Sequence, residues 1–595
     1  MSAIEQTPWL YRVVPAFDAL RRYTTSDLRA DVLSGLTVAA VAVPQAMAYA
    51  MVAGVPVEYG LYTAIVMTAV GALFDSSRQL INGPTNAISI AVLSVVGSVP
   101  TLDERVQAAV VLALMVGLIQ LAITLLRLGD LTRYISHSVI VGFTLGASGL
   151  LVLDQTKNLF GFNAVGDVHD HFVYRFWRTI AGGEIQTETL CVGLATIALV
   201  IVLRWLKPRL GLRLLPDLLL TVIVMAGSVA WLGLDARGVA VVGEIPAKLP
   251  SFQVPLIDAG QMSEFATGAL AIAVLGLLEA VAMAKAIAAH TRQKLDMNQQ
   301  CLSEGLANFA GSFFQCIPGS GSLTRSAINQ QAGAATQWSG VIAAAAVAVI
   351  VLAFAPYARF IPRAALAGIL MVSAWKMIDW PALRYHFRAT RFDAVIVGVT
   401  AFSAIAISVE FCVLIGVFMS FLLTVPRAGR MLLTEFVITP EGEIHERLPD
   451  DALCNRMLIF GLEGEMFFGA SAALERHFAR IERQIDEHTR VVVLRLKRAH
   501  NPDAVGLKLL EDFVDRVRAR DVRILLCGVR ESFAEKIERT GLAARIGDPV
   551  FREERVRLTS TLMAVRRAYE LISDRCPACP RRGGGGPDRA LYYAI

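Results

Sequence analysis

Long apolar stretches separated by short polar loops fill the first two thirds of the chain. A helix that crosses a bilayer needs about 20 mostly apolar residues. Stretches of this kind lie near 32–50, 59–75, 104–126, 134–153, 187–206, 215–233, 262–285, 338–356, 362–376, 391–408 and 411–426. Two shorter segments with polar starts lie near 84–98 and 321–333, and a weakly amphipathic one lies near 296–314. The pattern predicts an α-helical polytopic membrane protein with 14 transmembrane segments.

The charged residues divide the 595-residue chain into parts of different character. Overall 55% of the residues are hydrophobic and 18% are charged, against about 25% charged in soluble proteins. The 395 residues between Asp31 and Arg427 hold 23 Lys and Arg, whereas the 169 residues from Arg427 onward hold 29. Residues 1–31 are polar with mixed charge, unlike a signal peptide. We therefore expect a cytoplasmic segment (1–31), a transmembrane domain (32–430), an α/β domain (435–572) and a flexible tail (573–595).

Loop charges predict the orientation in the membrane. With the N-terminus in the cytoplasm, the inside loops carry 14 Lys and Arg and the outside loops carry 8, three of them in the long loop 154–186. Basic residues concentrate on the cytoplasmic side of membrane proteins. We expect both termini inside, in the plasma (inner) membrane. We interpret the net charge of +5 as basic residues that face a membrane surface, and not as a sign of nucleic-acid binding.

The two short segments share a sequence pattern. Asn82-Gly-Pro-Thr-Asn-Ala-Ile-Ser and Pro318-Gly-Ser-Gly-Ser-Leu-Thr-Arg-Ser each place Gly and Pro, then small polar residues, before a stretch too short to cross a bilayer. They are spaced like the first and eighth segments. This is typical of an inverted repeat of seven plus seven segments, whose broken helices meet at the membrane midplane. The alternative is that both are loops beside surface helices.

Arg325 stands at the start of the second short segment. Helix N-termini favour anions, an intramembrane charge is functional by default, and the guanidinium suits oxyanions and carboxylates. We expect Arg325 to bind an anion together with its donor neighbours Ser322, Thr324 and Ser326. The alternative is that Arg325 reaches a membrane interface.

Three further polar positions interrupt the apolar segments. Pro44 removes a backbone hydrogen bond within the first segment, and Gln45 and Tyr49 share one face one turn apart; they either line the same cavity or simply pack. Glu279 lies within an apolar run, where a carboxylate pairs with a cation or takes up a proton. It is either a proton-coupling group or the permanent ion partner of Arg325. Glu304 and Glu410 lie nearer segment ends and are expected at the interface.

The eight cysteines suggest neither a disulfide framework nor a metal centre. Most are single and scattered, and the close pair Cys576 and Cys579 lacks the further ligands that zinc requires. We expect incidental thiols in a flexible tail, no metal and no cofactor.

Together these segments resemble the sulfate permease (SulP) family, relatives of the animal sulfate and anion exchangers. The resemblance rests on these motifs: Asp31-Val-Leu-Ser-Gly-Leu-Thr-Val, Val43-Pro-Gln-Ala-Met-Ala-Tyr-Ala, Ala53-Gly-Val-Pro, Tyr59-Gly-Leu-Tyr, Asn82-Gly-Pro-Thr, Gly142-Phe-Thr, Val242-Gly-Glu-Ile-Pro and Gly321-Ser-Leu-Thr-Arg-Ser. It implies gate and core domains that move in an elevator-like step, and an anion site between the third and tenth segments. By motif position that site is expected to be lined by Gln45, Tyr49, Thr85, Asn86, Thr324 and Arg325, with Glu279 of the eighth segment beside it. It also implies a homodimer and a cytoplasmic STAS domain.

The C-terminal region fits that last element. Buried strands are expected at 490–496 and 522–528, alternating with amphipathic helices near 471–487, 504–520 and 532–541. Val505 stands where some relatives are phosphorylated, so that switch is absent, while binding of a cytoplasmic protein partner is retained. Sodium-coupled bicarbonate relatives place a Thr four residues after the acid of the eighth segment. Met283 stands there, and a thioether is a poor sodium ligand.

These features lead to secondary active transport of a small anion. Sulfate is favoured by the resemblance, with bicarbonate and dicarboxylates left open, and proton coupling or exchange is favoured over sodium. An anion-responsive membrane sensor that signals through the STAS domain, and a sodium-coupled bicarbonate transporter, are the alternatives. The apolar block contains no nucleophile–base set, metal-ligand cluster or phosphate loop, so an enzyme is not expected. A nucleobase symporter would use acids in the tenth segment, where this chain has Arg325.

Overall fold

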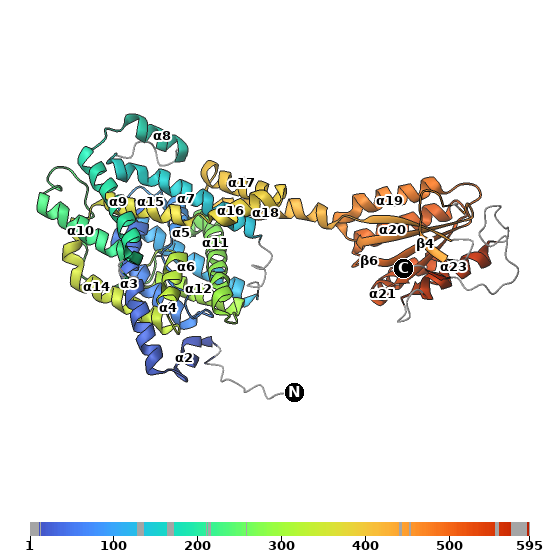
Figure 1. Cartoon of the computed structure of the whole chain (residues 1–595), viewed down its shortest axis with the longest axis horizontal. Coiled ribbons are helices and arrows are strands. Elements are labelled where there is room, and N and C mark those ends of the chain that lie inside the picture. The colour runs from blue at the N-terminus through green and yellow to red at the C-terminus, as the bar shows by residue number, and fades with distance from the viewer. Residues whose placement is uncertain are drawn as a thin grey trace. The chain divides into compact units, whose positions relative to one another are not determined.

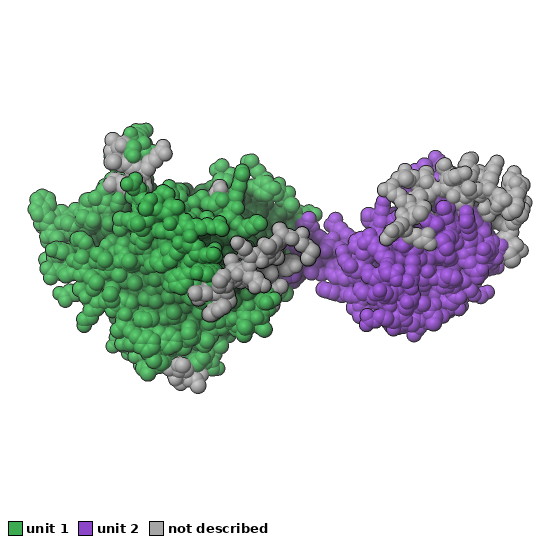
Figure 2. Space-filling model, turned by 90° about the horizontal axis from the view of Figure 1, so that it is seen from below, with its two compact units in different colours: residues 1–420 green, residues 421–595 purple. Residues whose placement is uncertain are grey.

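The computed structural model describes residues 11, 13–127, 136–162, 172–209, 211, 216–256, 259–438, 443–451, 454–553, 559–572 and 592–593. Cys576, Cys579 and nearly all of the expected tail lie outside these residues. The chain divides into two compact units, residues 1–420 and 421–595 (Figure 2). Each unit is described separately below.

The first unit consists almost entirely of helices (Figure 1). Their bounds are α2 (Pro15–Leu20), α3 (Thr25–Val52), α4 (Val57–Phe74), α5 (Asn86–Val96), α6 (Leu102–Leu125), α7 (His137–Phe160), α8 (Phe172–Gly182), α9 (Thr187–Arg209), α10 (Asp217–Leu232), α11 (Ala259–Thr291), α12 (Met297–Ser312), α13 (Leu323–Gln331), α14 (Trp338–Phe354), η2 (Ala355–Phe360), α15 (Arg363–Met377), α16 (Trp380–Ala389), α17 (Arg391–Ala406) and α18 (Val409–Ala428).

Nine helices of the described residues are long and apolar enough to cross a membrane, and α5 and α10 are shorter apolar helices. Large apolar side chains remain exposed on this unit, among them Trp231, Phe402 and Trp375, as expected of a surface that faces lipid. The predicted helical polytopic membrane protein is confirmed. Every segment expected from the sequence has a helix within a few residues of its predicted bounds.

Besides the short α2, two helices of the described residues were not expected. The stretch 154–186, predicted to be a loop, ends α7 and contains α8, and α16 precedes α17. Both α8 and α16 are short and strongly amphipathic, and nearly all their side chains are exposed or half-exposed. A search for long apolar runs overlooks such helices because their polar face lowers the mean hydropathy.

The helices pack in two groups. In one group α12 lies against α4, α6 and α11, and α14 lies against α3 and α4; in the other, α7 lies against α15 and α17, and α9 lies against α10 and α15. Glycines make the closest approaches possible, as in other helical membrane proteins. A Cβ at Gly117 of α6 would lie 2.5 Å from the backbone nitrogen of Phe309 in α12, and one at Gly146 of α7 would lie 2.6 Å from Ala404 Cβ in α17.

Two very short strands join the two broken helices. β1 (Asn82–Gly83) pairs antiparallel with β2 (Ser320–Gly321), and both are buried. β1 leads into α5 and β2 leads into α13. The pairing satisfies backbone groups that would otherwise be unpaired inside the membrane, and it brings the starts of the two short helices together.

The second unit is an α/β domain around a seven-stranded sheet of order β8-β7-β6-β5-β3-β4-β9. The strands are β3 (Leu432–Ile438), β4 (Glu443–Glu446), β5 (Met457–Glu465), β6 (Val491–His500), β7 (Arg523–Val529), β8 (Phe551–Arg552) and β9 (Tyr592–Tyr593). Strands β5 to β8 are parallel, and β3 runs antiparallel to β4 and β5.

The helices of this domain cover both faces of the sheet. They are α19 (Ser471–Gln484), α20 (Ala504–Arg518), α21 (Glu531–Arg539), α22 (Leu542–Ile546) and α23 (Thr559–Leu571). Phe478, Phe513 and Phe533 pack in one core with Leu494 and Leu526, while α23 closes a second core on the opposite face. The expected strands and helices are confirmed, whereas the following elements were not expected: β3, β4, β5, β8, β9, α22 and α23.

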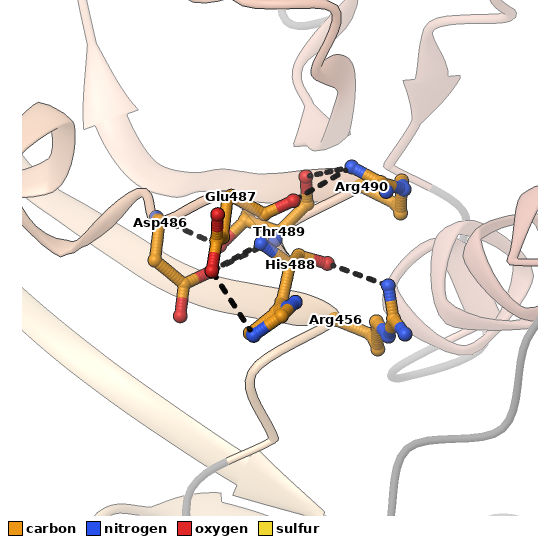
Figure 3. A network of polar contacts seen from close by, with 6 residues as sticks. All are labelled: Arg456, Asp486, Glu487, His488, Thr489 and Arg490. Atoms are coloured by element: carbon orange, nitrogen blue, oxygen red, sulfur yellow. Dashed lines mark hydrogen bonds and ion pairs between the residues drawn. The ribbon is translucent and has the colours of Figure 1, made fainter.

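In the turn before β6, the carboxylate of Asp486 accepts several hydrogen bonds (Figure 3). Asp486 Oδ1 accepts hydrogen bonds from the backbone nitrogens of His488 (3.0 Å) and Thr489 (2.9 Å) and from Thr489 Oγ1 (2.8 Å). Arg456 and Arg490 donate to backbone carbonyls of the same turn. Partial burial raises the pKa of Asp486, but the hydrogen bonds from Thr489 and His488 outweigh it and hold the pKa below its ordinary value.

Asp503, two residues before Val505, caps α20. Its carboxylate accepts from the backbone nitrogens of Gly506 and Phe468, each at 2.8 Å. Val505 is 43% exposed and has no hydroxyl group. The position therefore serves as a helix start.

Candidate functional site

The starts of α5 and α13 define the candidate site. Thr85 caps α5 and accepts a hydrogen bond from the backbone nitrogen of Ile88, and Ser322 caps α13 and accepts one from the backbone nitrogen of Arg325. Because β1 and β2 pair directly before these caps, two positive helix ends lie next to each other. Such ends attract an anion.

Arg325 lies across this junction. It is fully buried, and its Nη2 atom donates to the carbonyl oxygen of Pro84 at 2.9 Å. Among the described residues, Nε and Nη1 have no hydrogen-bond partner. Arg325 therefore does not reach a membrane interface. A buried guanidinium with two unused donors is expensive unless a ligand or water occupies them.

Gly83 makes room for this guanidinium. Its φ angle is +148°, and a Cβ there would lie 2.8 Å from Arg325 Nη1. Only glycine fits both the backbone conformation and the close approach. The sequence showed Gly83 as part of a broken helix but not as the neighbour of Arg325.

The first segment adds an amide and a ring to the same region. Gln45 is fully buried in α3, and neither polar atom of its amide has a partner among the described residues. Tyr49, one turn later, is 4% exposed and lies within range of the charges of Arg325 and Glu279. α3, the helix that carries this unsatisfied amide, therefore packs against both short helices, α5 and α13.

Glu279 of α11 meets α5 and makes no ion pair with Arg325. Thr85 Oγ1 donates to Glu279 Oε2 at 3.0 Å, and no ion pair joins Glu279 to any described residue within 4.0 Å. The permanent ion pair between Glu279 and Arg325 considered above is therefore absent from this conformation. Glu279 therefore contacts the start of α5 through a hydrogen bond from the hydroxyl group of Thr85, the residue that caps this helix.

The remaining predicted residues lie on the same two helices. Asn86 is 3% exposed; its Nδ2 atom contacts Met377 Sδ of α15 at 3.5 Å, and its Oδ1 atom has no partner in the described part of the chain. Ser322 is buried, and Thr324 is half-buried. Ser89, one turn after Thr85, was not predicted; it is fully buried and its hydroxyl has no partner there either. The sequence feature that could have identified Ser89 is its position four residues after Thr85, which places both on one face of the helix.

The expectation that Glu304 lies at a membrane interface is wrong. Glu304 is in the middle of α12 and is fully buried. α12 looked weakly amphipathic, but small residues let α4 and α6 enclose it: a Cβ at Gly305 would lie 3.0 Å from Leu121 of α6. Nothing is described of the Glu410 side chain. Among the described residues no group of three or more His, Cys, Asp and Glu is placed to hold a metal ion.

Comparisons with known proteins agree with this arrangement. The chain matches the sequence profile of the Sulfate permease family over residues 28–400 and that of the STAS domain over residues 450–556. Sulfate transporter 4.1, a chloroplastic protein of Arabidopsis thaliana, is 28% identical over 561 residues, covering 91% of this chain and 81% of that protein. The putative sulfate transporter YvdB of Bacillus subtilis is 28% identical over 540 residues, covering 89% and 97%.

The fold also has a solved counterpart. The structure of murine Solute Carrier 26 family member A9, an anion transporter in the inward-facing state, matches with a TM-score of 0.83 at 20% identity and covers 96% of each chain. At this identity the likeness establishes the fold alone. The family profile spans more than half of the chain, and the multi-pass helical unit and the α/β domain both fit it. This chain therefore belongs to the sulfate permease family, a family of membrane anion transporters and not of enzymes, and it carries a C-terminal STAS domain.

Proposed function

We propose that the protein carries out secondary active transport of a small anion, with sulfate as its main substrate. The names of the two relatives described above support sulfate. Binding takes place where α5 and α13 begin, and an elevator-like movement of the group that contains these helices carries the anion across the membrane. Alternating access of this kind suits broken helices that hold a ligand at the midplane.

One observation carries this proposal: Arg325 is fully buried beside two helix N-termini, and two of its donor nitrogens have no partner among the residues that the structure describes. Sulfate presents four oxygens and two negative charges, so it can satisfy several donors at once. Charge-assisted hydrogen bonds to an oxyanion are the strong ones. The ligand removes the cost of the unpaired guanidinium when it binds.

The proposed binding residues divide by the role that each can play. Arg325 supplies charge, Gln45 supplies an unsatisfied amide, and Tyr49 closes the α3 side. The hydroxyl and amide groups of the two short helices complete the site: Thr85, Asn86, Ser322 and Thr324. Because Thr85 also donates a hydrogen bond to Glu279, the orientation of the Thr85 side chain depends on both the bound anion and Glu279.

Glu279 is the proposed coupling group. A carboxylate next to the anion site repels the anion, and its protonation removes that repulsion. This arrangement supports either proton symport or an exchange mechanism in which protonation of Glu279 changes the affinity for the anion. The hydrogen bond from Thr85 Oγ1 to Glu279 Oε2 supports it, because the change of charge acts directly on a residue of the site.

The architecture proposed for transport has 14 membrane segments in a seven-plus-seven inverted repeat, with gate and core domains within residues 32–430. The equivalent placement of β1–α5 and β2–α13 and the two packing groups of helices support it. Both termini lie in the cytoplasm, the STAS domain spans 435–572, and the working unit is a homodimer.

Uptake of labelled sulfate into proteoliposomes tests the function. Wild-type protein should give saturable uptake that unlabelled sulfate competes for more strongly than bicarbonate, chloride, nitrate or fumarate. Arg325→Ala should abolish saturable uptake. The matched control is Arg105→Ala, which should retain saturable uptake, since within the described part of the chain Arg105 donates to the carbonyl oxygens of Gly54 and Val99 and not to groups of the anion site.

The outcomes separate the competing functions. Wild-type apparent affinity in folded Arg325→Ala rejects the anion site. Sulfate binding without any flux through wild-type protein indicates a membrane sensor, and stronger competition by bicarbonate with a sodium requirement indicates a sodium-coupled bicarbonate transporter.

A further inference from the structure

Glu304 occupies an unusual position for an acid. It is fully buried in α12, and neither carboxylate oxygen has a hydrogen-bond partner among the described residues. An ionised carboxylate in a dry interior without donors or a counter-charge is strongly unfavourable. A neutral carboxylic acid in the same place is tolerated far better.

The groups around Glu304 increase this penalty. α12 packs against α4, α6 and α11. The charged groups that act on Glu304 are Asp75, directly after α4, and Glu279 of α11, and both are acidic. From α6 comes an uncharged group, Gln120, whose Oε1 accepts from Asn308 one turn after Glu304.

Asp75 differs from Glu304 in its hydrogen bonds, although it too is fully buried. Its carboxylate accepts from Gln300 Nε2 at 2.6 Å and from Asn82 Nδ2 at 3.2 and 3.3 Å. Hydrogen bonds of this kind stabilise the ionised form. The two buried acids therefore differ in surroundings: Asp75 receives side-chain hydrogen bonds, whereas Glu304 receives none from the described residues, so burial favours the neutral acid more strongly at Glu304.

We propose that Glu304 is a proton-binding site of the membrane unit, separate from Glu279, which carries a proton at neutral pH and releases it in alkaline conditions. On release, the proton passes from one carboxyl oxygen of Glu304 to water, and Glu304 becomes a carboxylate. Release strengthens the negative field between Asp75 and Glu279.

Asp75 connects this site to the anion site. The Asn82 side chain that it holds belongs to β1, whose partner β2 leads into α13. A negative charge on Glu304 acts on Asp75 and so changes the field at the strand pair that positions Arg325. This part of the inference rests on the proposed transport function, whereas the protonation state of Glu304 does not.

Infrared spectroscopy of the full chain in lipid nanodiscs tests the protonation state directly. At neutral pH the wild type should show the carbonyl band of a protonated acid, which Glu304→Gln removes and Glu279→Gln leaves in place. Spectra that are the same for the wild type and Glu304→Gln at neutral pH overturn the proposal.

Thermal unfolding measurements show whether each variant is folded and how its stability depends on pH. The folded wild type keeps a proton that the unfolded chain releases, so its stability should fall as pH rises. Glu304→Gln and Glu304→Leu, which lose no hydrogen-bond partner, should remain folded and lack this fall. A large loss of stability at every pH in both variants shows that Glu304 is an ion-paired structural residue and overturns the proposal.

Sulfate uptake tests the link to transport. One proton that controls the rate changes it by up to about tenfold per pH unit, and Glu304→Gln should reduce that dependence while keeping saturable uptake. A pH profile identical to that of the wild type overturns the link. A sodium requirement that only Glu304→Gln removes identifies a metal cation as the ligand and also overturns the proton assignment.

Discussion

Gly83→Ala tests whether the anion binds at Arg325 without changing any polar group. The added Cβ would lie 2.8 Å from Nη1, whereas ordinary contacts begin at 3.4 Å. The guanidinium must therefore retreat by about half an ångström, since packed atoms cannot overlap. The positive φ of +148° adds backbone strain of about 1–3 kcal/mol.

The displacement sets the expected loss of affinity. A charge-assisted hydrogen bond contributes about 1.5–3 kcal/mol, and the retreat removes one such bond to the anion. The apparent KM for sulfate in proteoliposomes should therefore rise roughly ten- to 150-fold, with the protein still folded and monodisperse.

Gly333→Ala is the matched control. Gly333 follows α13 and has a φ of +93°, but a Cβ there has nothing within 4 Å. The control therefore carries backbone strain without the contact to Arg325. Equal losses in both variants would attribute the effect to strain, and an unchanged KM in Gly83→Ala would refute binding of the anion at this guanidinium.

Three further predictions concern coupling, assembly and the STAS domain. Glu279→Gln should flatten the pH dependence of sulfate uptake, because it removes the proposed coupling proton; an unchanged profile in the reconstituted variant rejects that role. Deletion of residues 435–595 should lower dimer yield or transport rate but retain sulfate binding, and complete loss of binding in a folded truncation would contradict this. Asp486→Asn should speed hydrogen exchange of the backbone amides of His488 and Thr489 in the full chain about fivefold, because hydrogen bonds to Asp486 stabilise the turn by about 1 kcal/mol. The wild-type turn should lose the same protection as the pH falls through the lowered pKa of Asp486, and unchanged exchange would show that the two arginines suffice.

Hydrophobic length predicted the membrane helices well because the bilayer imposes one length on every spanning segment. The strong β-branched runs at β6 and β7 were predicted for a similar reason, since buried parallel strands are nearly all apolar. The amphipathic helices α8 and α16 were not predicted in this way, and neither were the antiparallel strands β3 and β4, whose residues are of mixed polarity.

The candidate site shows a different limit of sequence reasoning. Arg325 and Thr85 were predicted because Gly, Pro and small polar residues mark a broken helix. The contact of Gly83 with Arg325 depends on which strands pair, and the burial of Glu304 depends on which helices enclose α12. Neither partner is close in sequence, so local pattern could not identify them.

The pairing of β1 with β2 has a consequence for synthesis of the protein. The backbone of Asn82 and Gly83 pairs with that of Ser320 and Gly321, which the ribosome makes much later, and only the Asn82 carbonyl has an earlier side-chain donor among the described residues, Thr68. Until residue 320 has been made, the remaining strand-pairing groups lack the partners that they have in the folded protein. Because lipid offers peptide groups no hydrogen bonds, we expect the third segment to reach its final place in the membrane only after β2 has been made.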